Sequence, residues 1–183
     1  MSTNQTASDN ISFLKHLRAV RAFRPGTVPE AALKDILDVA RWSGSASNRQ
    51  PWELVVVQDR EMLQALVNGE GSIKHVGSAA MAIILVMAGD PDRFPHETYD
   101  EGRLSERIML AAAAHGLGSC IGWFKGNAPS EVKEMLGIPA DRLVRTVISI
   151  GYPDEEARRA QPKRPQPRKP IAQIVHRERY TSL

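Results

Sequence analysis

The sequence predicts an α+β fold in which helices and strands pack as one sandwich. Its 183 residues are 42% hydrophobic, which is enough for one well-buried core. Apolar patterns with helical and strand periods alternate along the chain in the order αα-β-α-β-α-β-α-β, which is typical of an α+β or α/β sandwich. We therefore expect a single domain over residues 12–183, preceded by a disordered polar tail at residues 1–11.

Two helices are predicted before the first strand. Helical periodicity begins near Ser12 and ends at the turn formed by residues 24–26. The apolar side chains that share its face are Phe13, Leu17 and Val20. The second helix begins at residues 28–30, which place a proline in its first turn, and it runs to Trp42. Its apolar face consists of Leu33, Ile36, Leu37 and Ala40.

Four segments are predicted to be strands. Residues 54–57 and 81–87 are continuous apolar runs, and residues 143–150 alternate less than a half-exposed strand would, so all three are expected to be buried. Residues 119–124 form a further strand-like segment. The longest apolar run, residues 79–88, is half of the ~20 residues that a membrane-spanning helix needs. It therefore predicts a core strand and no membrane span.

Three helices are predicted between these strands. Asp59 is a natural N-cap for a helix that extends to about Asn68. A long helix over residues 99–115 has an apolar face rich in alanine, so we expect it at the centre of the fold. The residues on this face are Leu104, Ile108, Ala111, Ala112 and His115. A short helix begins at Pro129 and ends at Gly137.

The formal net charge of +3 and the pI of about 9.2 arise largely from one basic, proline-rich segment. Proline favours extended conformations, so residues 155–170 are predicted to run as an extended arm along a surface. Such an arm is either a solvated tail or a nucleic-acid contact, and nucleic-acid contacts commonly include aromatic side chains. The arm has no aromatic residue, so we expect no nucleic-acid partner.

The remaining composition favours a cytoplasmic protein. Residues 1–10 lack the basic start and the apolar run of a signal peptide. The single cysteine, Cys120, cannot form an internal disulfide, which fits a reducing compartment. We expect Cys120 to be a small core residue in preference to a nucleophile.

The loop over residues 43–52 is the most informative segment of the chain. Small residues dominate its first half, while Asn48 and Gln50 each offer amide donors and a carbonyl acceptor. Such a loop can place its backbone against a flat heterocycle. Arg18 and Arg21 are three apart on the predicted first helix, where they either bind an anion together or form the solvated face of that helix.

Other motifs with defined chemistry do not fit. Residues 116–122 are rich in glycine, but they follow a helix and precede a strand, which is the reverse of a dinucleotide-binding loop. The histidines lack metal-ligand spacing, and the polar residues 90–100 are better explained as a solvated connection, so we predict no metal. No nucleophile elbow is present. Paired arginines, a small-residue loop and a glycine-rich strand instead fit a cofactor that brings its own chemistry, with no obligatory catalytic side chain.

Six short motifs follow one another along the chain: Arg18-Ala-Val-Arg-Ala-Phe-Arg-Pro25, Val28-Pro-Glu30, Ser45-Ala-Ser-Asn-Arg-Gln-Pro-Trp52, Asp100-Glu-Gly102, Gly116-Leu-Gly-Ser119 and Arg168-Lys-Pro-Ile171. In this order they resemble the FMN-dependent nitroreductase family, over residues 12–180. The resemblance implies a sandwich with a central, mostly antiparallel sheet flanked by helices. It also implies a homodimer with the flavin site between its subunits, NADH or NADPH as reductant, and a small acceptor such as a nitroaromatic or a quinone.

The resemblance also implies which positions bind FMN. Arg21 would lie near the N1 and C2 carbonyl edge of the flavin, where a cation stabilises the reduced form, and Arg18 would lie toward the phosphate. Ile121 and Gly122 match the strand whose backbone passes the flavin N5. The remaining positions of the implied site are Ala19, Ser45, Ala46, Ser47, Asn48 and Arg168.

In this family, the loop that matches residues 45–48 and the arm that carries Arg168 contact different parts of the flavin site. Residues 45–48 match the loop that reaches the flavin bound mainly by the other subunit, and Arg168 matches a late phosphate-binding arginine on the arm. Leu17 and Ala19 stand where many members have arginine and serine, and Gln166 stands where some have a basic residue. Fewer side chains would therefore hold the phosphate here.

Two alternatives remain beside the oxidoreductase. The same residues would serve a flavin-binding module for storage or sensing, with little turnover. Family members with other flavin chemistry, such as dehalogenation or dehydrogenation, share the same motifs. The aromatic residues Trp42, Trp123 and Phe124 are either walls of an acceptor pocket or part of the core.

Overall fold

The computed structural model describes residues 3–160 and 168–180. Its centre is a five-stranded sheet in which the strands pair antiparallel. The strands are β1 (Phe23–Arg24), β2 (Trp52–Val57), β3 (Met81–Met87), β4 (Gly118–Trp123) and β5 (Leu143–Pro153). β5 pairs with β1, β3 and β4, and β3 also pairs with β2. The antiparallel sheet that was expected is therefore confirmed.

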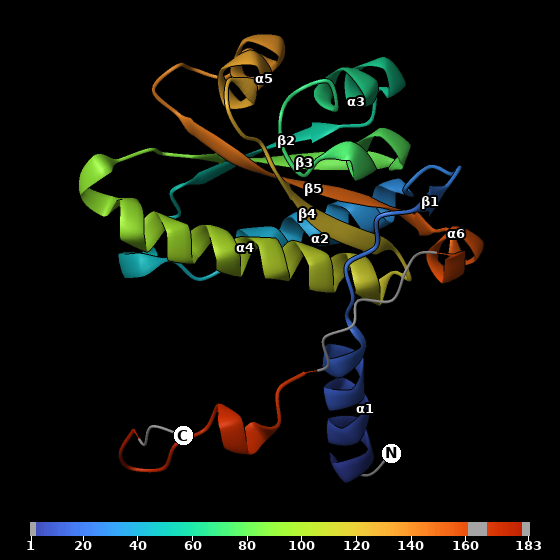
Figure 1. The fold of residues 1–183 in the computed structure, drawn as a ribbon, viewed down its shortest axis with the longest axis vertical. Helices are drawn as coiled ribbons and strands as arrows, with labels where there is room; N and C mark the ends of the chain where they lie inside the picture. Colours follow the sequence, from blue (N-terminus) through green and yellow to red (C-terminus); the bar gives the residue numbers. More distant parts are fainter. Residues whose placement is uncertain (1–2, 161–167, 181–183) are drawn as a thin grey trace.

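Helices cover both faces of this sheet, which confirms the sandwich (Figure 1). One face carries α2 (Glu30–Arg41) and α4 (Phe94–Ala114), and the other carries α3 (Arg60–Leu66) and α5 (Ala128–Leu136). Along β3, Ile83 and Leu85 pack into the core under α2 and α4, whereas Ile84 and Val86 pack into the opposite core. Because alternate side chains of β3 serve two cores, the strand is apolar throughout.

Local signals located several elements correctly. β3 spans the predicted residues 81–87. The Asp59 carboxylate accepts a hydrogen bond of 2.8 Å from the Met62 N–H and caps α3. Gly137 follows α5 in the left-handed conformation, with φ of 67°, and ends that helix as predicted.

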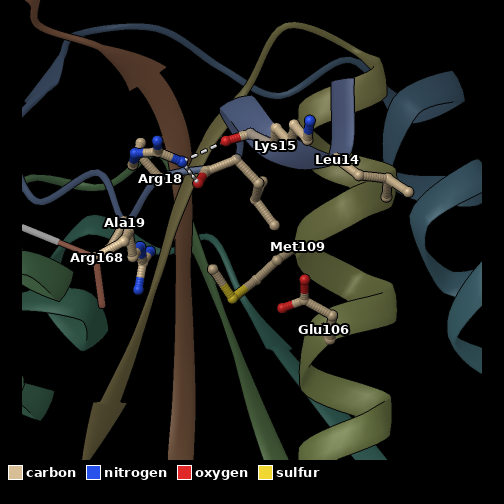
Figure 2. Close-up of a pocket in the computed structure, with 8 residues that line it drawn as sticks. Leu14, Lys15, Arg18, Ala19, Glu106, Met109 and Arg168 are labelled. Atoms are coloured by element: carbon tan, nitrogen blue, oxygen red, sulfur yellow. Dashed lines mark hydrogen bonds between the residues drawn. The ribbon is translucent and has the colours of Figure 1, made fainter. Parts of the chain in front are cut away.

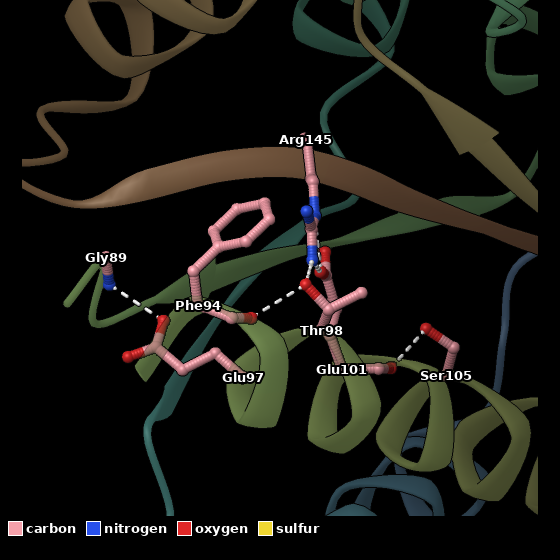
Figure 3. Close-up of polar contacts among 7 residues, drawn as sticks. All are labelled: Gly89, Phe94, Glu97, Thr98, Glu101, Ser105 and Arg145. Atoms are coloured by element: carbon pink, nitrogen blue, oxygen red, sulfur yellow. Dashed lines mark hydrogen bonds and ion pairs between the residues drawn. The ribbon is translucent and has the colours of Figure 1, made fainter. Parts of the chain in front are cut away.

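α4 is the central helix, but it begins at Phe94 and not at Tyr99. The Glu97 carboxylate accepts hydrogen bonds from the Gly89 and Asp90 N–H groups, at 2.9 and 3.2 Å. These bonds hold the polar connection against the first turn of α4 (Figure 3). The helix therefore begins before the first residue of its predicted apolar face. Its fully buried residues include Leu104, Ile108 and Ala112.

The predicted disordered tail is wrong over its described part, because α1 (Thr3–His16) occupies most of it. Side chains one turn apart stabilise this helix: Gln5 Nε2 donates to Asp9 Oδ1 at 3.0 Å, and Ser12 contacts His16 at 3.3 Å. Hydrophobic periodicity predicted this helix only from Ser12 onward, because the residues before Ser12 are largely polar and are exposed from Gln5 onward.

The first helix was also predicted to extend too far, since it ends at His16. The Arg18 guanidinium donates to the carbonyl oxygens of Lys15 and Leu17, at 2.6 and 2.7 Å, and so satisfies acceptors left open at the helix end. The chain then runs extended beside β4 before forming β1. Arg18 and Arg21 therefore lie beyond α1 and do not form the solvated face of that helix.

The predicted extended arm begins as a helix, α6 (Glu155–Ala160). The Asp154 carboxylate accepts a hydrogen bond of 2.9 Å from the Ala157 N–H and so caps this helix. The prediction of an extended arm rested on the prolines and did not take this cap into account. Residues 161–167 of the arm lie outside the described residues. Beyond them, the chain forms one short 3₁₀ turn, η4 (Ile171–Gln173).

α1 and the C-terminal segment project together from the body of the molecule (Figure 1). Both carry exposed apolar side chains, namely Ile11, Phe13, Leu14, Ile171, Ile174, Val175 and Tyr180. These segments therefore present apolar surface that the described part of the chain does not cover.

Among residues 3–160 and 168–180, no helix combines the length and the apolar character that crossing a membrane requires.

Candidate functional site

An open pocket of about 630 Å³ lies between the end of α1, α4 and the C-terminal segment (Figure 2). Its lining residues are Leu14, Lys15, Leu17, Arg18, Ala19, Glu106, Met109 and Arg168. The structure thus brings together three residues that the sequence singled out: Arg18, Ala19 and Arg168. Two guanidinium groups and a lysine outnumber the single Glu106 carboxylate in this open pocket, so it suits an anion with several oxygens.

The start of β4 adjoins this pocket. Ala19, which lines the pocket, pairs with Ser119, and the neighbouring Val20 N–H donates to the Ser119 carbonyl at 2.8 Å. At the other end of the strand, Trp123 and Ser72 exchange two hydrogen bonds, of 3.0 and 3.1 Å. The polar backbone groups of Ser119 and Trp123 therefore point away from β5.

Ile121 lies between these two positions, so its N–H and C=O point along the same edge of β4. Gly122 follows, and it leaves no room for a side chain. A Cβ there would lie 2.9 Å from the Ser72 carbonyl oxygen and 3.1 Å from His75 Nε2. Glycine thus lets β4 pack tightly against the segment before β3, while Ile121 offers a backbone donor at the edge.

His75 is a residue of this site that sequence reasoning missed. It lies on η2 (Lys74–Ser78), is 8% exposed, and has Nδ1 2.8 Å from Ser149 Oγ on β5. Burial lowers the pKa of His75 below its ordinary value; the Ser72 carbonyl opposes this, and the positive charge of Arg21 lowers the pKa further. The charge of Arg21 is therefore felt at His75, which lies beside Gly122 of β4. No spacing rule could have paired residues 74 positions apart.

The loop over residues 45–50 is held in an unusual backbone conformation. Ser47, Asn48 and Gln50 have φ values of 53°, 53° and 52°, in the left-handed region that most residues avoid. Within it lies η1 (Ala46–Asn48). The Ala46 N–H donates to both Asp100 carboxylate oxygens, at 3.1 and 3.3 Å, and this buried anion fixes the loop to α4.

Within a single chain, the loop of residues 45–50 does not reach the basic pocket that contains Arg18 and Arg168. Asp100 anchors the loop to the first half of α4, whereas Glu106 and Met109, further along that helix, line the pocket. The predicted residues Ser45, Ala46, Ser47 and Asn48 thus form a second group, apart from Arg18, Ala19 and Arg168. Gly44 is pressed against α4, since a Cβ there would lie 2.0 Å from Arg103 Nη2.

A second pocket, of about 300 Å³, lies beyond Ile121 between α4 and β4. Trp123 and Phe124 contribute to its lining, together with Glu101 and Arg145, which form an ion pair (Figure 3). Arg145 Nε donates to Glu101 Oε2 at 2.6 Å, but Glu101 Oε1 is buried without a hydrogen-bond partner.

The three aromatic residues differ in position. Trp123 is 58% exposed and walls the second pocket, while Phe124 lines the same pocket from within the core. Trp42 is exposed and is therefore not a core residue.

Among the polar residues 90–100, Asp92 and His96 are exposed, as a solvated connection would have them, but two acidic residues are not. Glu97 and Asp100 are buried and accept backbone hydrogen bonds, as described above. Across the described ranges, no group of three or more histidine, cysteine or acidic side chains is arranged to hold a metal ion.

Comparison with known proteins gives a consistent set of similarities. The model of the Nitroreductase family matches residues 14–69 and 69–152. An oxygen-insensitive NADPH nitroreductase of Salmonella typhimurium is 27% identical over 190 residues, covering 96% of this chain and 76% of that protein. Nitroreductase NfnB of Mycolicibacterium smegmatis is 29% identical over 195 residues, covering 79% of this chain and 82% of that protein.

Solved structures are similar as well. The FMN-dependent nitroreductase of Clostridium difficile superposes with a TM-score of 0.76 at 26% identity, covering 93% of this chain and 99% of that chain. The NADPH:FMN oxidoreductase of Vibrio harveyi, complexed with NAD+, superposes with a TM-score of 0.77 at 25% identity, covering 94% and 78%.

Proposed function

The chain belongs to the nitroreductase family, and we propose that it is an FMN-dependent oxidoreductase that takes electrons from NADH or NADPH. The observation that carries this proposal is the pocket of Arg18 and Arg168, which adjoins the β4 edge through Ala19. FMN combines an anionic phosphate with a ring that has donors and acceptors along one edge. When bound, FMN supplies hydride acceptance from the nicotinamide and electron transfer to a small acceptor such as a nitroaromatic or a quinone.

The residues present fit the two ends of FMN. Arg18 and Arg168 offer cationic donors to the phosphate, and Ile121 offers a backbone N–H to the ring. Arg21 brings positive charge to the ring end, which favours the reduced state. Ala19 contributes no side-chain donor, so the phosphate depends on the two arginines and on backbone groups.

A homodimer would complete this site. The loop of residues 45–48 lies apart from the basic pocket of its own chain, yet it is held rigidly in a strained conformation. α1 and the C-terminal segment project with apolar side chains uncovered. We propose that a second copy covers these segments and that its loop reaches the flavin site of the first.

The pocket beside Trp123 is the proposed position of the acceptor. It adjoins Ile121, and its walls combine apolar surface with the Arg145 cation, which suits a small aromatic molecule with polar substituents. We place the reaction in the cytoplasm, since a single buried cysteine is compatible with a reducing compartment.

Steady-state turnover tests this function against the flavin-binding alternative. Protein loaded with FMN is supplied with NADH or NADPH, with and without a nitroaromatic or a quinone, and nicotinamide oxidation is followed. The oxidoreductase predicts oxidation that depends on the added acceptor. A protein that retains FMN but oxidises neither nicotinamide with any such acceptor would instead be a flavin-binding module.

A further inference from the structure

His75 is a buried titratable group directly behind the proposed flavin edge. Its Nε2 faces Gly122, where an added Cβ would lie 3.1 Å away, and the residue is 8% exposed. A side chain so placed does not touch a ligand at the edge. Its neighbours at that edge are the backbone groups of Ile121 and Gly122.

Hydrogen bonding sets the tautomer of the neutral ring. The Ser149 hydroxyl donates its one hydrogen to the Cys120 carbonyl, at 3.3 Å. With its hydrogen directed to that carbonyl, the hydroxyl oxygen accepts from His75 Nδ1, 2.8 Å away, and this arrangement assigns the proton to Nδ1. In the neutral ring Nε2 is then a bare acceptor, and in the structure it is buried with no hydrogen-bond partner.

The surroundings of Nε2 suit a donor better than an acceptor. The carbonyl groups of Ser72 and Ile121 lie close enough to favour a protonated ring. Burial and the positive charge of Arg21 oppose protonation and outweigh the carbonyls. Negative charge added at the β4 edge would offset Arg21 and shift this balance.

Two charged side chains on the elements next to His75, Lys74 and Arg60, are positive, so they do not favour its protonation. Lys74, the preceding residue on η2, is exposed. Arg60 of the adjacent α3 is engaged by the carbonyl groups of Gly77 and Ala79. The charged side chain that acts on the ring is Arg21, whose charge is positive.

We propose that His75 is a positioning residue that takes up one proton at Nε2 when negative charge arrives beside Ile121 and Gly122. The proposal rests on the proposed function, because hydride transfer to bound FMN is the event that adds the charge. The hydride brings two electrons and one proton from NAD(P)H, which leaves as NAD(P)+. The further proton comes from solvent to His75, and it returns to solvent when the acceptor removes the electrons.

Nitrogen NMR of histidine-labelled protein tests this uptake directly. The FMN-loaded protein is compared in the oxidised state and after anaerobic reduction with dithionite, at about pH 7.5, above the ordinary histidine pKa. The expected result is that Nδ1 stays protonated in both states while Nε2 changes from unprotonated to protonated on reduction. The signals of His75 are identified by their absence in His75→Gln. If His75→Gln does not fold, Ser149→Ala, which shifts the signals of the same ring, identifies them instead. An Nε2 signal that is identical in both states overturns the proposal.

The midpoint potential gives a second readout that a merely structural role would not move. Over part of the pH range the wild-type potential should fall more steeply than that of His75→Gln, by one proton per two electrons. One proton corresponds to a tenfold change per pH unit, or about 30 mV for a two-electron couple. His96→Gln, which removes an exposed histidine, should keep the wild-type slope. Equal slopes in wild type and His75→Gln overturn the proposal alone, whereas a protein that binds no FMN overturns the proposed function with it.

Discussion

The side-chain carboxylate of Asp100 accepts two hydrogen bonds from the backbone N–H of Ala46, which lies 54 residues earlier in the chain. The Asp100 side chain is only 5% exposed, so water competes little for these bonds. Through them, the central helix fixes a loop whose backbone is strained at Ser47, Asn48 and Gln50. The loop is thus positioned before any ligand arrives, as a rigid binding surface requires.

Asp100→Asn is expected to loosen this loop and weaken FMN binding about tenfold, since a charge-assisted hydrogen bond contributes about 1.5–3 kcal/mol. Flavin fluorescence quenching measures the affinity. Asp38→Asn is the matched control, because Asp38 is exposed and pairs only locally with Arg41. If Asp100→Asn lowers the free energy of unfolding but leaves FMN affinity unchanged, the loop is not part of the flavin site.

Arg168→Ala is expected to weaken FMN binding at least tenfold, because one of the two guanidinium groups in the basic pocket is lost. Riboflavin, which lacks the phosphate, separates this role from ring recognition: its affinity should be the same for wild type and variant. Arg41→Ala removes an exposed arginine elsewhere and should change neither affinity. An equal loss for FMN and riboflavin would place Arg168 at the ring or make its effect structural.

Mixed dimers test whether two chains share each site. Arg168→Ala damages the pocket, and Asp100→Asn damages the loop that the partner is proposed to lend. When the two variants are co-expressed, a heterodimer has one site with both defects and one with neither. Isothermal titration should therefore find one tight FMN site per heterodimer. If both sites of the heterodimer are weakened, the loop and the pocket act within one chain.

Arg145→Met is expected to destabilise the fold by about 3–5 kcal/mol, because it leaves the buried carboxylate of Glu101 without its ion-pair partner. Adding Glu101→Gln removes that charge and should restore much of the loss. Urea unfolding of the two variants measures both effects. A double variant that is no more stable than Arg145→Met would show that the loss comes from packing against Phe94, over whose ring Arg145 lies.

His75 should make the FMN-free protein less stable in mild acid. Its pKa is lowered in the folded state, so below the ordinary value of 6.5 the unfolded chain binds a proton that the folded chain does not. This favours unfolding, and the stability present at higher pH is lost as the pH falls through about 6.5. Urea unfolding at about pH 7.5 and pH 5.5 should show a smaller difference for His75→Gln than for wild type. An equal difference would assign the acid sensitivity to other groups.

The parts of the fold that the sequence predicted well are those encoded locally. The apolar run of β3 and the Asp59 cap each lie within a few neighbouring residues, so pattern and spacing were sufficient. The part of α1 before Ser12 escaped this reasoning because its residues from Gln5 onward are exposed in the described part of the chain, where polar pairs one turn apart stabilise the helix.

The sequence motifs predicted which residues belong to the candidate site, but not which of them contact one another. Arg18 and Arg168 were singled out, yet their common pocket forms only when the C-terminal segment lies beside α1. The bonds from Asp100 to Ala46 and from His75 to Ser149 join residues 54 and 74 positions apart. Single-sequence spacing carries no information on such pairs, because the sheet and α4 create them.

The most direct test of the proposed chemistry is the visible spectrum of the FMN-loaded protein under anaerobic conditions, recorded before and after one equivalent of NADH or NADPH is added. We predict that the protein retains FMN through gel filtration and that the visible flavin band bleaches, with the band restored by a quinone or a nitroaromatic. A protein that fails to retain FMN, or whose bound flavin stays oxidised with both nicotinamides, would contradict the proposed oxidoreductase.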